Sequence, residues 1–459
     1  MSAPIKTYGT DFTEAPIAPA LLRFSLPLFL ASLLQVLYNA VDMVVVGQVL
    51  GKEGLSAVSV GGDVANLLTF IAMGFANAAQ VLISQLVGAK KREKLGSFIG
   101  TAFSFSILCA LLLGVVCLFF RTPILRLMNT PEEAFADALG YATVSMIGLV
   151  FIYGYNVASA VLRGLGDSKR PFIFIAIASF LNVVLDLLFV LGLGMRAMGA
   201  ALATVISQGA SFVFAAVFVF KNKARFDLSL QAKDFLHIKG EHLSPLLKLG
   251  VPMAIKSASI QISKLFVNSY INSYGLAVSG FAGIANKIGS ISNLFSNSLN
   301  TAGSSMVGQN VGAKKYGRVP KIVLWVALFT FGIASLLSLV LCLFPREVYS
   351  IFTKDAEVLA VGLTYLPIAV LIFFGSAARA PMNALINGSG NYRVNFATAI
   401  LDGVVMRIGL SVLFGLYLGM ESMGFWLGDA LAGFTPFFIG IVFYLTGSWK
   451  KTNKKSEEE

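Results

Sequence analysis

Two polar residues interrupt a long apolar stretch in the first half of the chain. Asn182 and Asp186 lie within the run from Phe172 to Leu193, which is long enough to cross a bilayer as one helix. Because the two residues are four apart, a helix places them on one face, one above the other. The simplest role for them is a hydrogen bond between helices. We favour a functional site at Asp186, because a carboxylate at bilayer depth is costly and rarely lacks a role.

The composition of the chain is that of a polytopic membrane protein. It has 459 residues, of which 56% are hydrophobic and only 13% charged, and its mean hydropathy is +0.79. A soluble protein of this length would have about a quarter of its residues charged. The net charge of +12 does not indicate a nucleic-acid partner, because the basic residues concentrate in short loops between apolar runs. The expected environment is therefore a lipid bilayer.

The second half of the chain repeats the first. QLVGAKK at residues 85–91 returns as QNVGAKK at 309–315, and RGLGDSK at 163–169 returns as NGSGNYR at 387–393, both after 224 residues. GMRAMG at 194–199 and GMESMG at 419–424 are 225 residues apart, as are Pro27 and Pro252. Each half holds about six expected spans, and an even number makes the repeat parallel, with its pseudo-twofold axis along the membrane normal.

These patterns predict an all-α fold of about twelve transmembrane helices in two six-helix lobes. We expect a polar lead at residues 1–20, an N-terminal lobe at 21–220, a linker at 221–244, a C-terminal lobe at 245–447 and a tail at 448–459. Lysine and arginine are most frequent in the loops after the second span, between the fourth and fifth spans, at the matching positions of the second half and in the tail. Both termini and the linker should thus be cytoplasmic.

Taken together, the motifs resemble those of the multidrug and toxic compound extrusion (MATE) family. They are the proline-bearing first span that ends VDMVVVGQVLG at residues 41–51, the Q-x-V-G-A-K-K loop, the RGLGDSKRP turn at 163–171 and NVVLD at 182–186. The resemblance covers nearly the whole chain. It implies a cavity between two lobes and efflux by alternating access across the cell membrane. The implied substrates are amphipathic, often cationic, compounds, and the implied driving force is inward flow of protons or sodium.

The same resemblance implies a cation site in the N-terminal lobe. One branch of the family has an aspartate on the first span, an Asn and an Asp one turn apart on the fifth, a threonine on the sixth and often an Asn on the fourth. The matching residues here are Asp42, Asn182, Asp186, Thr204 and Asn156. Their oxygens are hard ligands suited to a small hard cation such as sodium, and two desolvated aspartates can alternatively share one proton. The competing interpretation is that Asp42 lies near the end of its helix and is simply solvated.

The second half departs from this pattern. The positions that match Asn182 and Asp186 hold Met406 and Leu410, so the repeat did not keep two such sites. Another branch of the family has an acidic residue nine positions after the second proline, where this chain has Gln261. Several cationic residues instead fall at or near membrane depth, together with two aspartates: Lys256, Lys264, Lys287, Arg379, Arg407, Asp402 and Asp429.

We expect Asp402 to pair with Arg407, and we expect Lys256 to snorkel to an interface. Lys264 and Lys287 should face the substrate cavity, and the candidate lining residues are Gln35, Asn39, Gln261, Lys264 and Lys287. Pro27 and Pro252 each lie inside a span and should kink it. The kink is either static or a functional bend that links the Asp42 site to the cavity.

The leading hypothesis is a cation-coupled antiporter for small organic compounds, acting as a monomer. We find no hydrolytic or redox constellation, so we expect neither an enzyme nor a cofactor, and no metal beyond a sodium ion at Asp42, Asn182, Asp186 and Thr204. A flippase for a lipid-linked saccharide or another anionic lipid is the alternative, supported by the lysines of the second half. A membrane scaffold or a channel without coupled transport is less consistent with two intramembrane carboxylates.

Overall fold

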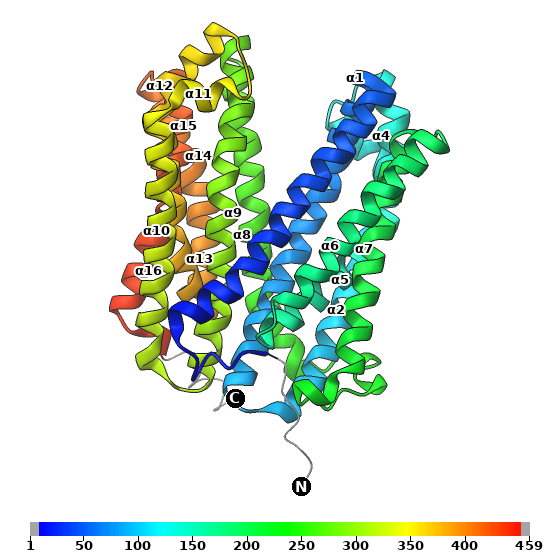
Figure 1. Ribbon diagram of the computed structural model, residues 1–459, viewed down its shortest axis with the longest axis vertical. Helices are drawn as coiled ribbons and strands as arrows, with labels where there is room; N and C mark the ends of the chain where they lie inside the picture. Colours follow the sequence, from blue (N-terminus) through cyan, green and yellow to red (C-terminus); the bar gives the residue numbers. More distant parts are fainter. Residues whose placement is uncertain (1–8, 451–459) are drawn as a thin grey trace. The chain divides into compact units, whose positions relative to one another are not determined.

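The computed structural model describes residues 9–450, and within them the chain is almost entirely helical, without strands (Figure 1). Eight helices are long and apolar enough to cross a membrane, and a ninth span forms if α4 and α5, which meet at a bend of 48°, are taken together. Two further helices, α8 and α9, are 33 and 37 residues long but more polar. If α1 counts as two spans and α8 and α9 as one each, the described residues contain the twelve spans that the sequence predicts.

The first half contains six spans and the linker. Its elements are α1 (Ile17–Gly88), α2 (Arg92–Phe119), the short α3 (Arg121–Leu127), α4 (Glu132–Ile147), α5 (Leu149–Gly164), α6 (Lys169–Asp186), the π-helical η1 (Leu187–Gly192) and α7 (Arg196–Lys221). Two 3-10 turns follow in the linker, η2 (Lys223–Phe226) and η3 (Ala232–Phe235). At Gly51, α1 has φ 61° and ψ −147°, which are not helical values, so this residue separates the first two spans.

The second half has the same order of elements. They are α8 (Gly240–Asn272), α9 (Leu276–Gly312), η4 (Tyr316–Arg318), α10 (Val319–Leu343), the short α11 (Pro345–Ser350), α12 (Ala356–Gly388), α13 (Tyr392–Ile400), the π-helical η5 (Leu401–Met406), α14 (Arg407–Val412), the π-helical η6 (Leu413–Tyr417), α15 (Glu421–Ala432), α16 (Thr435–Leu445) and η7 (Ser448–Lys450). The segments α13 to η6 form one continuous span, as do α15 and α16.

The backbone confirms the internal repeat at the level of turns. Left-handed conformations recur in five pairs at the same spacing of 224 or 225 residues as the motifs: Gly51 and Gly275, Lys90 and Lys314, Gly166 and Gly390, Gly194 and Gly419, Arg196 and Glu421. The π-helical segments η1 and η6 also occupy matching places, shortly before the fourth of these pairs, Gly194 and Gly419. In contrast, η5 has no counterpart in the first half, where the matching residues belong to α6.

Each half forms a compact unit with its own apolar core, although the boundary near the N-terminus differs from the expected one. Residues 26–250 form the first unit together with Gly9 and Thr10, and residues 11–25 pack with 251–450 in the second. The backbone N–H of Phe12 donates to Gln309 Oε1 at 2.9 Å, and Asn310 donates to the Phe12 carbonyl at 3.1 Å. Parts of the expected lead and tail, residues 1–8 and 451–459, lie outside the described residues.

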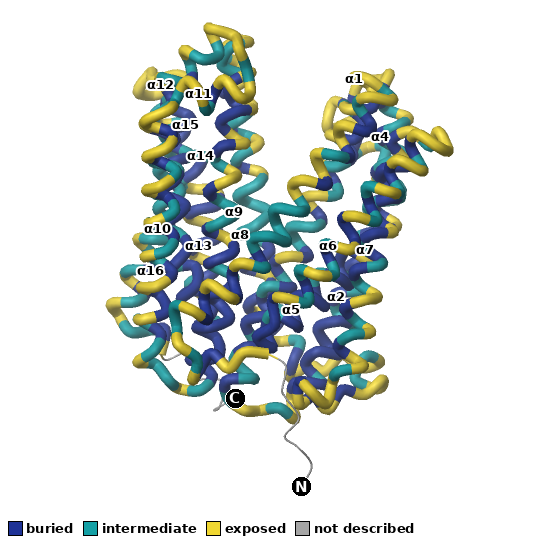
Figure 2. Tube along the Cα trace, in the orientation of Figure 1, coloured by how far each residue is buried: buried dark blue, intermediate teal, exposed yellow. Residues whose placement is uncertain are grey.

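Both units have exposed residues along their helices (Figure 2), and many of these residues are large and apolar. On α2, for example, Leu112 and Val115 are 59% and 65% exposed. Such a surface is unfavourable in water but suits a helix that faces lipid. Pro27 lies within α1 and Pro252 within α8, and both helices continue through them. The functional bend at these prolines stays a prediction.

The linker is docked on α2 by close backbone contact. Ser104 donates to the Phe235 carbonyl at 2.7 Å, and Arg92 donates to the Phe226 carbonyl at 2.8 Å. A side chain at Gly100 would collide with the backbone of Asp234 in η3, so only glycine permits this approach. The linker is therefore part of the first unit.

Candidate ion-binding site

Three helices of the first unit carry the candidate site. Asp42 lies on the part of α1 before Gly51, Asn182 and Asp186 lie on α6, and Thr204 lies on α7. Helix α6 begins where Asp167 Oδ1 accepts the backbone N–H groups of Lys169 and Arg170, at 3.1 and 3.2 Å. It ends at Asp186, and the chain continues directly into η1. Single π-helical turns within a helix are frequent at functional sites.

The structure brings the four residues together. Thr204 Oγ1 donates to Asp42 Oδ2 at 3.5 Å, and Asn182 Nδ2 donates to Thr204 Oγ1, also at 3.5 Å. Asp186 is one helical turn after Asn182 on the same face of α6, and its carboxyl group interacts with that of Asp42. We call Asp42, Asn182, Asp186 and Thr204 the α1–α6–α7 cluster.

The cluster is buried and has more acceptors than donors. Asp42, Asn182 and Asp186 are 6%, 1% and 0% exposed, which rules out the interpretation that Asp42 is simply solvated. Asp42 Oδ1, Asn182 Oδ1 and both carboxyl oxygens of Asp186 receive no hydrogen bond from any described residue. Neither aspartate forms an ion pair with a basic side chain within residues 9–450. Buried acceptors without donors are costly, and either a proton or a hard cation would satisfy them.

Two neighbours of the cluster share a helix face with one of its members, at the same four-residue spacing that separates Asn182 from Asp186. Tyr38 is four residues before Asp42, and Gln208 is four residues after Thr204, so each lies on the same helix face as its partner. Gln208 Nε2 donates to Tyr38 Oη at 3.5 Å. Both line a small pocket with Asn182 and Thr204, the remaining lining residues being Ile175, Ala178, Ser179 and Ser207. The helical spacing could have identified both.

Three of the residues named from the sequence lie apart from the cluster. The amide of Asn156 donates to the carbonyl of Ile152 in its own helix at 2.8 Å, and no hydrogen bond to the cluster is present. Gln35 is half-buried and Asn39 is exposed on α1, and neither bonds to another described residue. Hydrogen bonds thus link Asp42, Asn182 and Thr204, while Asn156 is bonded within its own helix, and the role of these residues as cation ligands stays a prediction.

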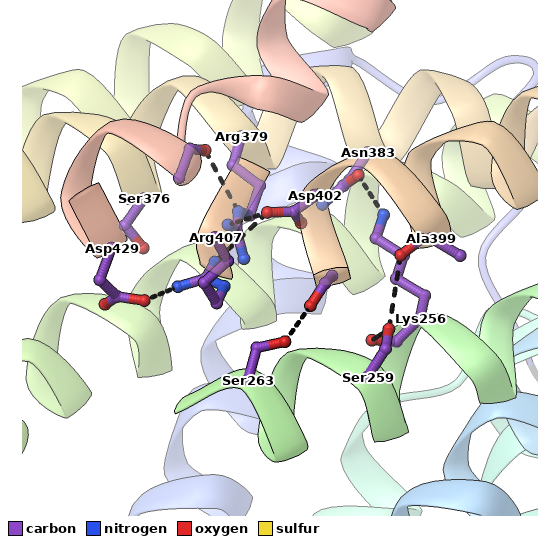
Figure 3. Close-up of polar contacts among 12 residues, drawn as sticks. Lys256, Ser259, Ser263, Ser376, Arg379, Asn383, Ala399, Asp402, Arg407 and Asp429 are labelled. Carbon is purple, nitrogen blue, oxygen red and sulfur yellow. Dashed lines mark hydrogen bonds and ion pairs between the residues drawn. The ribbon is translucent and has the colours of Figure 1, made fainter. Parts of the chain in front are cut away.

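The second unit contains a buried ionic network on α12, η5, α14 and α15 (Figure 3). Asp402 Oδ1 accepts from Arg379 Nη2 at 3.0 Å and from Arg407 Nη2 at 3.2 Å. Arg407 also forms an ion pair with Asp429 through Nη1. The expected pairing of Asp402 with Arg407 is confirmed, and Arg379 and Asp429 extend it. Both carboxylates of this network are thus paired with arginine.

The three lysines of the second unit have different surroundings. Lys256 does not snorkel as we expected, because its Nζ donates to Asn383 Oδ1 at 2.6 Å (Figure 3). Lys264 lines a pocket inside the unit together with Asp429. Lys287 is exposed on α9 and is not among the residues that line this pocket, and Gln261 is half-buried on α8 without a bond to a described residue. A shared cavity for Lys264 and Lys287 stays a prediction.

The chain matches one protein family across both halves. The MatE family model matches residues 27–188 and again residues 252–413. The chain is 30% identical over 436 residues to the probable multidrug resistance protein YoeA of Bacillus subtilis, covering 93% of each protein. It is 29% identical over 443 residues to the probable multidrug resistance protein YpnP of the same organism, covering 96% of this chain and 97% of YpnP.

Solved structures give the same fold. The outward-facing conformation of a multidrug resistance MATE family transporter has a TM-score of 0.89 to this chain, at 24% sequence identity. The match covers 97% of this chain and 99% of the other. At this level of identity the likeness concerns the fold alone.

Proposed function

The chain belongs to the MATE family of membrane transporters, and from this premise we propose that it exports amphipathic organic compounds in exchange for protons or sodium ions. Members of the family are transporters and not enzymes, and their substrates are small molecules. The names of the relatives favour multidrug export over the lipid-flippase alternative. The proposed location is the cell membrane, with both termini in the cytoplasm and a monomer as the working unit.

The observation that carries the coupling proposal is the unmet hydrogen-bonding capacity of the α1–α6–α7 cluster. Two buried carboxyl groups lie side by side with four acceptor oxygens that no described residue satisfies, counting that of Asn182. With both aspartates ionised, the empty site holds two like charges in a medium of low dielectric, which is unfavourable. One bound proton would turn the repulsion into a hydrogen bond between the carboxyl groups, and a sodium ion would be held by the oxygens of the cluster.

Coupling follows if the loaded and the empty cluster favour different conformations of the transporter. A ligand shifts a conformational equilibrium only by the difference in its affinity for the two states. The cluster joins three helices, α1, α6 and α7, so its occupancy can change how these helices pack. We propose that alternating access depends on this difference, with the cation entering as the organic compound leaves.

The test is dye efflux from vesicles that contain the purified protein, driven separately by a pH gradient and by a sodium gradient. The wild type should respond to one gradient, and Asp186→Asn should respond to neither, because an amide takes up no proton and contributes no charge to a cation. Asp137→Asn is the matched control, since that acid is paired with Arg196 in an exposed ion pair of the same unit. Gradient-driven efflux that survives in Asp186→Asn would contradict the proposal.

A further inference from the structure

The second unit carries an excess of positive charge in and beside one pocket. Four cationic and two acidic side chains occur there, which is a formal excess of two positive charges; Lys264 and Asp429 line the pocket, and Lys256, Arg379, Arg407 and Asp402 belong to the polar network beside it. The two arginines and the two aspartates pair with each other (Figure 3). The excess therefore resides on the two lysines.

Only one of these lysines donates a hydrogen bond to another described residue. Lys256 donates to the amide oxygen of Asn383. Lys264 forms no hydrogen bond or ion pair with another described residue, although it lines the pocket beside Asp429. Asp429 does not neutralise it fully, because that carboxylate is already bound by Arg407. The half-buried ammonium group of Lys264 is therefore left to pair with a ligand that carries a negative group.

The rest of the pocket lining suits an organic anion. Asn293 receives a hydrogen bond from Ser376 on its Oδ1 at 2.9 Å, which leaves its amide N–H groups as donors. Asn268 and Asn286 add further amides, and the rings of Tyr365 and Trp426 form part of the wall. A cation and amide donors beside aromatic surface match a carboxylate attached to an aromatic body.

We propose that the pocket between α8, α9, α12 and α15 binds the carboxylate of an aromatic organic anion or zwitterion through Lys264. The ligand is a transport substrate only if the chain exports organic compounds as proposed above. Binding itself can be measured without a gradient, so the two proposals can fail separately.

The test compares two dyes that differ only in the charge of one group, a rhodamine with a free carboxylate and the ethyl ester of the same dye. Their dissociation constants for the purified full-length protein in detergent are measured by fluorescence anisotropy. The wild type should bind the acid about tenfold more tightly than the ester, the order expected for one charge-assisted hydrogen bond. Lys264→Gln should abolish this preference, whereas Lys264→Arg should keep most of it. Lys321→Gln is the matched control, because that lysine is exposed on α10, a helix that contributes no residue to the pocket, and the variant should bind both dyes like the wild type.

Equal binding of acid and ester by the wild type would overturn the inference, as would a preference that survives in Lys264→Gln. The wild-type comparison requires no variant, so it decides the question even if Lys264→Gln does not fold. Gradient-driven efflux of both dyes without a preference for the acid would leave the proposed function in place and reject this pocket. A preference for the acid without any gradient-driven efflux would support the pocket and reject the transport proposal.

Discussion

Each unit has two aspartates in its polar cluster, but the two units surround them in opposite ways. In the first, Asp42 and Asp186 have no basic partner among the described residues, and three of their four oxygens receive no hydrogen bond. In the second, Asp402 and Asp429 are both bound by Arg407, and Asp402 also by Arg379. A carboxylate already paired with an arginine has little affinity left for a mobile cation. This difference supports the proposal that the first unit holds the exchangeable cation site, and it favours a structural role for the cluster of the second unit.

The internal repeat makes this comparison informative. Asp186 matches Leu410 in the second half, and Asp402 matches Ala178 in the first, so neither acid was retained by both copies. Two units with the same order of helices therefore carry acidic residues at different positions of the repeat. Substitutions in either unit test this contrast.

The largest effect should come from removing the arginine that both acids of the second unit share. Arg407→Gln leaves the buried Asp402 with one of its two arginines and the half-buried Asp429 with none, and breaking a buried ion pair in this way costs about 3–5 kcal/mol. We expect a strong loss of thermal stability in detergent. The control is Arg196→Gln, which breaks an exposed ion pair with Asp137 and should cost at most about 1 kcal/mol. Equal melting of the two variants would show that the network does not stabilise the second unit.

The next effect concerns ion binding by the first unit. If sodium is the coupling ion, sodium at about 100 times its dissociation constant should stabilise the protein by about 2.7 kcal/mol. This stabilisation should vanish in Asp42→Asn and in Asp186→Asn, and the double variant should be no worse, because the two carboxyl groups act as one site. Asp402→Asn should lower the overall stability but keep the response to sodium.

Melting that is independent of sodium would assign the site to protons. Drug binding in weakly buffered solution should then release protons from the wild type and not from Asp186→Asn. A sodium response that persists in Asp186→Asn would remove the contrast between the two units.

A smaller effect is expected at the hydroxyl that joins two of the helices. Thr204 connects Asn182 on α6 to Asp42 on α1 through two long hydrogen bonds of 3.5 Å. Thr204→Val removes both at nearly constant volume, and we expect a loss of about 1 kcal/mol, or roughly fivefold in apparent ion affinity. Thr204→Ser retains the hydroxyl and should behave like the wild type. The measurement is the same melting titration, and identical midpoints for Val and Ser would exclude the hydroxyl as a ligand.

Much of the fold could be predicted from the sequence because the bilayer imposes a minimum length on every apolar run. The repeated motifs then placed the turns in register, and the left-handed residues Gly51 and Gly275 bear this out. The α1–α6–α7 cluster was accessible for a related reason, because Asn182 and Asp186 are one helical turn apart. Its neighbours Tyr38 and Gln208 could have been found by applying the same four-residue spacing to α1 and α7.

The ionic network of the second unit could be predicted only in part, because it depends on local geometry and on helix rotation. Asp402 and Arg407 are five residues apart, which is a loose match to one face of an α-helix. In the structure Asp402 lies in η5, whose π-helical i→i+5 hydrogen bonds bring residues five apart over one another. No pattern in the sequence marks that turn. The contributions of Arg379 and Asp429 come from other helices, and their rotation is set by packing.

The smallest effect is expected at Asn156, one of two asparagines that the sequence placed in the same site. Asn182 bonds to Thr204, and its Oδ1 receives no hydrogen bond from a described residue, whereas the amide of Asn156 is bonded to the Ile152 carbonyl of its own helix. Asn182→Ala removes a ligand and should weaken the ion response at least as much as Thr204→Val. Asn156→Ala should change the midpoint by less than about twofold and the stability by at most about 0.5 kcal/mol, as for substitutions that break no special feature. Equal losses in the two variants would show that the Asn156 amide leaves its own helix to reach the ion, and the site would then extend to α5.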